Sequence, residues 1–212
     1  NQNVNFIPTN ASNYNTVPVT VSVTVAKAAS SVDTNPTASS ITYGQTLASS
    51  ILSGGVASVP GSFAFATPTT APSAGTANQS VVFTPTEASN YNASTISVSV
   101  TVDKAPTSIT TVPSASGISY GSTLSSATLS GGVGSVPGSF AFTSPSTIPN
   151  AGTSNYSVTF TPTDTANYLS STTSVSVSVG KSTPTISTVP TASGITFGQT
   201  LASSSLSGGA AS

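Results

Sequence analysis

The stretch Ser97-Val98-Ser99-Val100-Thr101-Val102 alternates strictly between hydroxyl and valine side chains. Successive side chains of a β-strand point to opposite faces of the sheet, so this pattern predicts a strand with its three valines buried and its hydroxyls in water. The same pattern recurs at Val21-Val23-Val25 and at Val175-Val177-Val179. The chain is therefore expected to build its core from β-strands, one such strand in each of three places.

Four further strands are expected upstream of this stretch, separated by glycine and proline turns. They are residues 31–34, 41–43, 62–66 and 80–84. Turn residues cluster at Ser53-Gly54-Gly55, Pro60-Gly61 and Pro72-Ser73-Ala74-Gly75. Leu47–Leu52 is ambiguous between a single helical turn and another strand, and no segment has a sustained helical period.

The whole pattern repeats along the chain with a fixed period. Lys27, Lys104 and Lys181 are the only basic residues and lie 77 apart, and residues 27–103 match residues 104–180 at roughly 48 of 77 positions. Self-similarity at a fixed period is the signature of a tandem array. We expect the end of one repeat at 1–26, full repeats at 27–103 and 104–180, and the beginning of another at 181–212. Because both ends fall inside a repeat, we interpret the chain as part of a longer array.

Five to seven short strands in each repeat predict a small antiparallel β-sandwich, immunoglobulin-like in the broad sense. A compact β-grasp-like module is the alternative, in which Leu47–Leu52 would supply the helix. A module of this size without a disulfide is expected to gain stability from contact with neighbouring repeats.

Composition excludes several classes of function. Only 3% of residues are charged and the net charge is −1, so the chain has no basic patch for nucleic acid. The sequence also has no apolar run of the ~18 residues that span a membrane. Histidine and cysteine are absent, which removes the commonest general base and the usual metal ligands. We therefore expect no enzymatic activity, no cofactor and no metal. Abundant Ser, Thr, Val, Gly and Asn favour an extracellular or cell-surface protein.

Three motifs carry a family resemblance: Ile41-Thr42-Tyr43-Gly44-Gln45-Thr46-Leu47, Val59-Pro60-Gly61-Ser62-Phe63, and Phe83-Thr84-Pro85-Thr86-Glu87 with Asn90-Tyr91. They resemble the tandem bacterial MBG (YGX-type) and bacterial Ig-like repeats of large surface or secreted proteins. The resemblance covers essentially the whole chain and implies an extracellular β-rich array with a structural or adhesive role. It implies no catalytic site and no ligand residues. The third copy departs from the motif, with Phe197 in place of tyrosine.

The single lysine of each repeat is the best candidate for covalent chemistry. An intramolecular isopeptide bond joins a lysine to an Asn or Asp beside a buried acid. The sequence offers two such sets: Lys104 with Glu87 and Asn90 (or Asn78), and Lys181 with Asp164 and Asn167 (or Asn155). The alternative is that each lysine is solvated at the repeat junction and discourages edge pairing.

Two kinds of surface could bind a ligand. The Asn-Tyr pairs at 13–14, 90–91 and 167–168 could stack a sugar, or could plug the end of the core. The rows of Ser and Thr on outward strand faces could bind crystalline polysaccharide, or could form a neutral solvated face. Both interpretations of each feature stay open in the sequence.

These observations predict a structural segment of an extracellular filament or fibre. The expected partners are copies of the chain or neighbouring repeats, and a surface polysaccharide is a further candidate. A passive stalk of a large adhesin and a repeat-wise carbohydrate-binding module are the alternatives.

Overall fold

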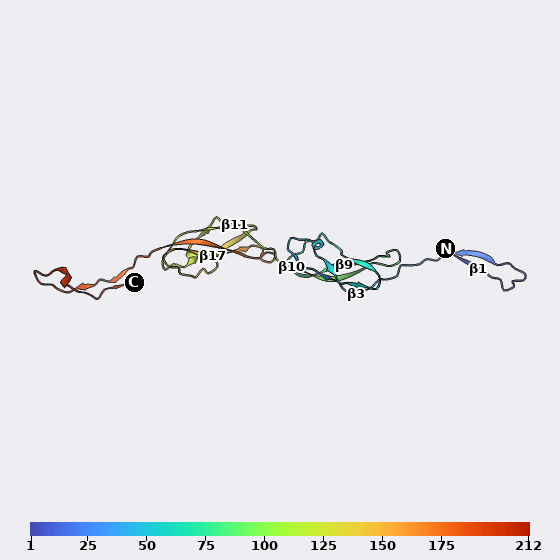
Figure 1. Ribbon diagram of the computed structural model, residues 1–212, viewed down its shortest axis with the longest axis horizontal. Helices are drawn as coiled ribbons and strands as arrows, with labels where there is room; N and C mark the ends of the chain where they lie inside the picture. Colours follow the sequence, from blue (N-terminus) through green and yellow to red (C-terminus); the bar gives the residue numbers. More distant parts are fainter. The chain divides into compact units, whose positions relative to one another are not determined.

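A computed structural model describes residues 1–212, in two compact units, Asn1–Ala105 and Pro106–Ser212. Each unit contains one complete copy of the repeated module. In the first unit the copy comprises β3 (Val32–Thr34), β4 (Thr37–Ala38), β5 (Ile41–Thr42), the 3₁₀ turn η1 (Leu47–Ser49), β6 (Leu52–Ser53), β7 (Val56–Ala57), β8 (Gly61–Phe65), β9 (Gly75–Pro85) and β10 (Ser94–Asp103). Figure 1 labels β3, β9 and β10 among these elements.

The second unit repeats the same elements, displaced by one period of the sequence repeat. They are β11 (Ile109–Thr111), β12 (Ser114–Ala115), β13 (Ile118–Ser119), η2 (Leu124–Ser126), β14 (Leu129–Ser130), β15 (Val133–Gly134), β16 (Gly138–Phe142), β17 (Gly152–Pro162) and β18 (Ser171–Gly180). The two similar sequences therefore fold into modules with the same order of elements.

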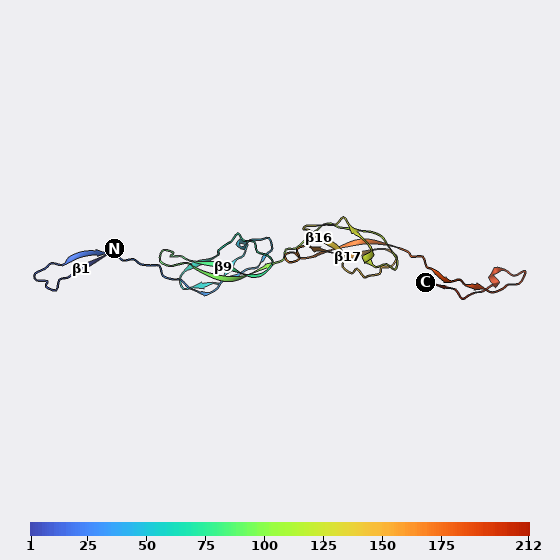
Figure 2. The same ribbon diagram turned by 180° about the vertical axis from the view of Figure 1, so that it is seen from behind.

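The larger sheet of each module has four strands. In the first unit the order is β5-β10-β9-β8, with β8, β9 and β10 antiparallel and β5 parallel to β10. The long strands β9 and β10 run side by side, as Figures 1 and 2 show. The alternation of β10 buries Val98, Val100 and Val102, which are at most 5% exposed, whereas the hydroxyl residues between them face solvent.

Two short strand pairs form the second layer. The pairs are β3 with β7 and β4 with β6, both antiparallel. The extended segment 32–42 thus changes layers, because it pairs with β7 and β6 and then, at β5, with β10. Ala38 and Leu52 from this layer pack against the valines of the larger sheet. The module is therefore an all-β sandwich, and the expected tandem array of Ig-like β-sandwich modules is confirmed.

Each module has a core of its own. In the first unit it consists of Ile41, Leu47, Phe65, Val81 and the three valines of β10. In the second unit the residues that match Leu47, Phe65, Val81 and the three valines form the cluster together with Ala127, and Ile118, the counterpart of Ile41, packs against it partly buried. The ambiguous segment Leu47–Leu52 forms one 3₁₀ turn, which buries Leu47, and then enters β6. No helix in the structure is long and apolar enough to cross a membrane.

The partial copies expose residues that the complete modules bury. In the first unit β1 (Gln2–Phe6) pairs with β2 (Val17–Val21), and Phe6 is 63% exposed whereas its counterpart Phe83 is 1% exposed. The strand expected through Val25 ends at Val21, which pairs with Gln2. Half a module does not form a core by itself.

The C-terminal partial copy contains the counterparts of the module's first half. Its elements are β19 (Ile186–Thr188), β20 (Thr191–Ala192), η3 (Leu201–Ser203), β21 (Leu206–Ser207) and β22 (Ala210–Ala211). β19 pairs with β22 and β20 with β21, as in the second layer of the complete modules. Leu201 is 84% exposed, whereas its counterparts Leu47 and Leu124 are buried, so this half also lacks a closed core.

Candidate functional site

The acid and the amide of each predicted isopeptide set lie together in the turn before the last strand. Asn90 Nδ2 donates a hydrogen bond to Glu87 Oε2 over 3.1 Å. In the second unit, Asn167 donates two hydrogen bonds to Asp164, from Nδ2 over 2.8 Å and from its backbone N over 3.2 Å. The Asp164–Asn167 pair is half-buried, whereas Glu87 and Asn90 are exposed. The turn is thus stabilised by a carboxylate–amide contact in both modules.

The lysines assigned to these sets lie at the other end of the same strands. Lys104 follows the last residue of β10, while Glu87 and Asn90 precede its first residue. Ten strand residues span about 30 Å at 3.3 Å per residue, far beyond the reach of a lysine side chain. Lys181 is separated from Asp164 and Asn167 by β18 in the same way. The structure therefore brings together the acid and amide of each set and contradicts the proposed bonds to Lys104 and Lys181. The alternative amides Asn78 and Asn155 are paired within the sheet, opposite Ser99 and Ser176.

A different segment reaches the turn. Ala28 forms a parallel bridge with Tyr91, in which Ala28 N donates to the Asn90 carbonyl over 2.8 Å and Asn92 N donates to the Ala28 carbonyl over 2.9 Å. From the sequence, each turn was paired with the lysine that follows the last strand of the same repeat. In the first unit the turn is met instead by the residue that follows Lys27, at the start of the module. This contact joins the two ends of the module's sequence, and no local pattern signals it.

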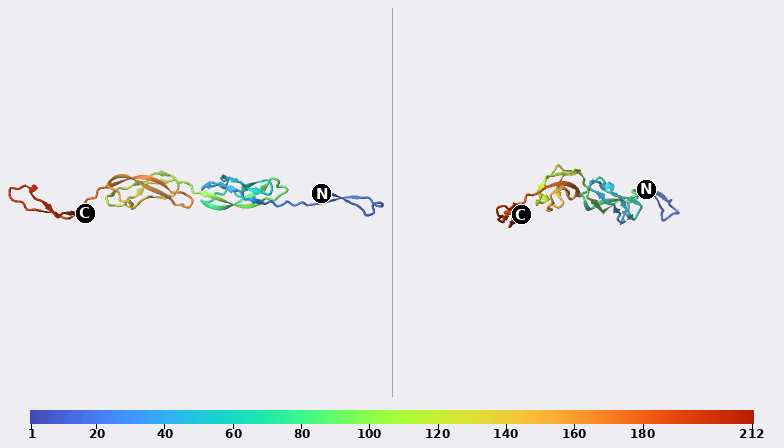
Figure 3. Two further views of the ribbon diagram at one scale, coloured as in Figure 1. Left: turned by 60° about the horizontal axis from the view of Figure 1, so that its bottom comes forward. Right: turned by 60° about the vertical axis from the view of Figure 1, so that its left-hand side comes forward.

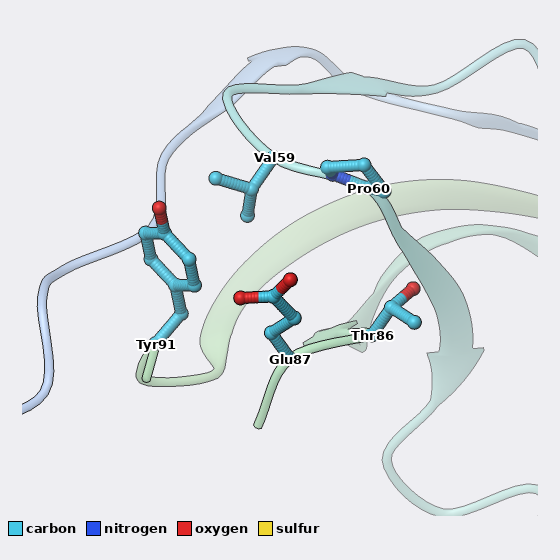
Figure 4. Close-up of a pocket in the computed structure, with 5 residues that line it drawn as sticks. All are labelled: Val59, Pro60, Thr86, Glu87 and Tyr91. Atoms are coloured by element: carbon cyan, nitrogen blue, oxygen red, sulfur yellow. The ribbon is translucent and has the colours of Figure 1, made fainter. Parts of the chain in front are cut away.

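A small pocket lies beside this turn, lined by Val59, Pro60, Thr86, Glu87 and Tyr91, with a volume of about 190 Å³. Figure 4 shows the Glu87 carboxylate and the Tyr91 ring facing the same space. The second unit has the same pocket, of about 240 Å³, lined by Val136, Pro137, Thr163, Asp164 and Tyr168. Small-molecule sites usually measure about 300–1,000 Å³ and enclose their ligand. Each pocket is below that range, so the sugar-stacking hypothesis gains no support from its size.

Charge is almost absent from the surface of each module. In the first module no charged residue occurs between Asp33 and Glu87, and in the second none occurs between Lys104 and Asp164. No group of three or more His, Cys, Asp or Glu side chains is arranged to hold a metal ion. The surface features that remain are neutral: hydroxyl-lined sheet faces and the edges of strands.

Comparison with known proteins returned no matching family model and no match among curated proteins. Among solved structures, the chain is similar to a three-domain immunoglobulin segment of titin in a Glu-to-Ala variant, with 11% identity, 76% of this chain and 69% of that chain covered, and a TM-score of 0.35. It is also similar to fibronectin(III)-like modules of CbhA from Clostridium thermocellum, with 16% identity, 72% and 94% covered, and a TM-score of 0.22. The fold assignment rests on the strand pairing of each module.

Proposed function

We propose that this chain is a tension-bearing structural segment of an extracellular filament made of tandem β-sandwich repeats. The single observation that carries the proposal is the path of the chain through each module. The segment that enters the module runs parallel to the strand that leaves it, over the whole length of that strand. The two ends of the module are thereby bonded to each other, at the beginning and at the end of the leaving strand.

In the first unit these bonds begin at the entry, where Ala28 bridges Tyr91. Ser30 Oγ donates to the Asn92 carbonyl over 2.7 Å, and Asn35 Nδ2 donates to the Ser97 carbonyl over 3.4 Å. They end at the exit, where β5 pairs with Val102 and Asp103, and Tyr43 N donates to the Asp103 carbonyl over 2.8 Å. The entering segment is thus bonded to the leaving strand at both ends of that strand, with two side-chain hydrogen bonds between them.

The second unit has the same arrangement. Thr107 Oγ1 donates to the Leu169 carbonyl over 2.8 Å near the entry, and Tyr120 N donates to the Gly180 carbonyl over 2.8 Å at the exit. At the same exit, β13 pairs in parallel with the last two residues of β18. The entry and exit bonds recur in both modules, with Thr107 in place of Ser30, whereas the Asn35–Ser97 bond has no counterpart because Val112 replaces Asn35. Recurrence of the end bonds indicates that this arrangement belongs to the repeat.

This geometry favours resistance to pulling. Because the chain enters near Tyr91 and leaves at Asp103, a force on the two ends acts along the strands. The two strands must then slide past each other, so the bonds between them share the force and break together. A force that pulled two strands apart from one end would instead load their hydrogen bonds one at a time, so that each bond would carry the force alone. A module of this topology is suited to a fibre or stalk under tension.

The near absence of charge supports a filament over a passive stalk. Neutral strand edges and faces repel one another little, so copies of the chain can associate laterally. The extracellular setting is part of the same proposal and draws on the Ser/Thr-rich, nearly uncharged composition. The stalk of a large adhesin remains the alternative, because the same force-resistant module would serve there.

Electron microscopy of the purified chain over a series of concentrations separates the two. A filament segment forms ordered fibres that lengthen or thicken as the concentration rises. A passive stalk stays as single particles at every concentration, and that result would overturn the filament proposal.

A further inference from the structure

We propose that copies of this chain associate laterally through one strand edge of each module, β8 in the first unit and β16 in the second, paired antiparallel with the same edge of a second copy. The inference rests on the proposed filament function and names the edge that would join neighbouring copies within the filament. It follows from three properties of these strands: the direction of their backbone groups, their side chains and their surroundings.

β8 is the terminal strand of its sheet, bonded on one side only, to β9. The phase of that ladder is fixed by two bonds that flank it, from Thr86 N to the Pro60 carbonyl and from Ala66 N to the Ser80 carbonyl, both over 2.9 Å. Hydrogen-bonded pairs alternate along an antiparallel ladder, so the groups of Ser62 and Ala64 also point to β9.

The backbone N–H and C=O groups of Gly61, Phe63 and Phe65 consequently point away from the sheet. β16 has the same phase, because Thr163 N donates to the Pro137 carbonyl and Thr143 N to the Ser157 carbonyl. Its outward groups belong to Gly138, Phe140 and Phe142. Each module thus presents three alternate outward-facing residues as a template for another strand.

The side chains leave this edge accessible. Phe63 and Phe65 face the core, while Gly61, Ser62 and Ala64 are exposed and small. Natural edge strands are commonly protected by charged side chains, above all lysine. The charged residues nearest to β8 in sequence are Asp33 and Glu87, so the strand itself has no such protection. The other end of the sheet, β5, is only two residues long and offers a shorter template.

Prolines limit how far the pairing extends. Pro60 precedes β8 and Pro68 follows it closely, and neither can donate a ladder hydrogen bond. The contact is therefore confined to about five residues and is weak by itself. Because every complete module carries one such edge, a tandem array makes many contacts at once, and multivalency supplies the strength of the assembly.

The ladder phase also fixes the register. All three outward residues of each strand find a partner when the two strands are related by a two-fold axis at Phe63. Phe63 then lies opposite Phe63 of the second copy, and Gly61 lies opposite Phe65. Each of these three pairs exchanges two hydrogen bonds, about six in all. In this register Ser62 lies opposite Ala64 of the second copy in a non-hydrogen-bonded pair, where Cα atoms are about 4.5 Å apart, a separation that a disulfide can span.

The chain has no cysteine, so engineered cysteines test this register directly. One variant carries Ser62→Cys and Ser139→Cys, and the other carries Ala64→Cys and Ala141→Cys. Each pair of substitutions covers both modules of the full chain. Mixed under mild oxidation, the two variants are expected to form intermolecular disulfides at least tenfold faster than either variant alone, because the proposed register places each new cysteine opposite the other kind.

A charge variant tests the same edge without cross-linking. Ala64→Lys with Ala141→Lys places a cation on each edge and is expected to raise the concentration needed for filaments at least tenfold. Ser99→Lys with Ser176→Lys is the matched control, since it adds the same charge to the exposed face of an interior strand, paired on both sides. Circular dichroism spectra and thermal midpoints of the two lysine variants, compared with those of the unmodified chain, establish that both remain folded.

The outcomes separate this inference from the proposed function. If the unmodified chain forms no filaments at any concentration, the filament function fails and this inference fails with it. If filaments form but the cysteine mixture cross-links no faster than the single variants, the filament function stands and the edge pairing is wrong. If both lysine variants disrupt filaments equally, association uses the sheet face and the edge pairing is again wrong.

Discussion

Replacing Phe83 with alanine should unfold, or nearly unfold, one module and leave the other intact. Phe83 is 1% exposed, and its ring lies 5.1 Å from that of Phe63 at an angle of 46°. The space around it is filled closely: a Cβ added at Gly61 would lie 2.5 Å from the ring. Truncation to alanine therefore leaves a cavity that the surrounding backbone cannot readily close.

The expected cost is about 3–5 kcal/mol, the usual range for Phe→Ala in a core. A module of this length is expected to have a total stability of roughly 4–12 kcal/mol. The substitution thus removes a large share of the stability, and the thermal midpoint of the first module should fall by roughly 12–40 °C. The second module should keep its midpoint, because the two core clusters have no residue in common.

Hydrogen–deuterium exchange on the full chain measures both modules in one sample. Peptides from β10 and from β18 differ in sequence, so their protection is read separately. Phe83→Ala should reduce protection in β10 only, and Phe160→Ala should reduce it in β18 only. Ser97→Ala, on the exposed face of β10, is the control and should change neither by more than about 0.5 kcal/mol. Equal loss of protection in both modules, or a cost below about 1 kcal/mol, would refute this reasoning.

The packing, the lysine positions and the composition support three more predictions. Gly61→Ala should destabilise the first module by about 1–3 kcal/mol, because the new Cβ would lie 2.5 Å from both the Phe83 ring and the Thr84 carbonyl oxygen. Gly117→Ala is the control in the same thermal unfolding experiment and should be neutral, because the nearest atom to its new Cβ is 3.4 Å away. The intact mass of the chain should equal the mass of its sequence, since Lys104 lies too far from Glu87 and Asn90, and Lys181 too far from Asp164 and Asn167, for the predicted bonds; a mass lower by one ammonia for each complete module would show that the bonds form. The thermal midpoint should be nearly constant between about pH 5.5 and 9, because the chain lacks the histidine and cysteine side chains that ordinarily titrate there; a shift of more than about 5 °C would contradict that expectation.

The long strands of the module could be predicted from the sequence. Alternating valine and hydroxyl residues around Val100 indicated β10, and the apolar residues of 80–84 indicated β9, since period-2 alternation follows directly from strand geometry. The predicted strands are shorter than the observed ones. The first residues of β9 are small or polar without alternation, and at the start of β10 only Ile96 continues the apolar alternation. Figure 3 shows the equivalent long strands of the second unit, β17 and β18.

The second layer could not be predicted from local pattern. β4, β6 and β7 are two residues long, too short to display any period, and they exist because segment 32–42 finds partners elsewhere in the module. The close packing of Gly61 on the Phe83 ring is equally invisible in sequence, where Pro60-Gly61 indicates only a turn.

The contact between the acid and the amide of the candidate site could be predicted from the sequence, but the position of the lysine could not. The Asn90–Glu87 contact spans three residues, so sequence proximity indicated it correctly. The placement of Lys104 was wrong because proximity in sequence is misleading across a straight strand, which carries the chain about 30 Å away in about ten residues. The contact of Ala28 with Tyr91 depends on the parallel path of the entering segment, which only the folded module reveals.

Single-molecule force measurement examines whether the entering and leaving strands of each module bear tension. The chain is held by its two ends and extended at constant speed. We predict two unfolding events of similar force, each releasing roughly 230 Å, which is about 77 residues at ~3.5 Å each less the ~40 Å length of a folded module. Smooth extension without distinct events, or one event that releases both modules together, would contradict an array of separate modules whose entering and leaving strands bear tension.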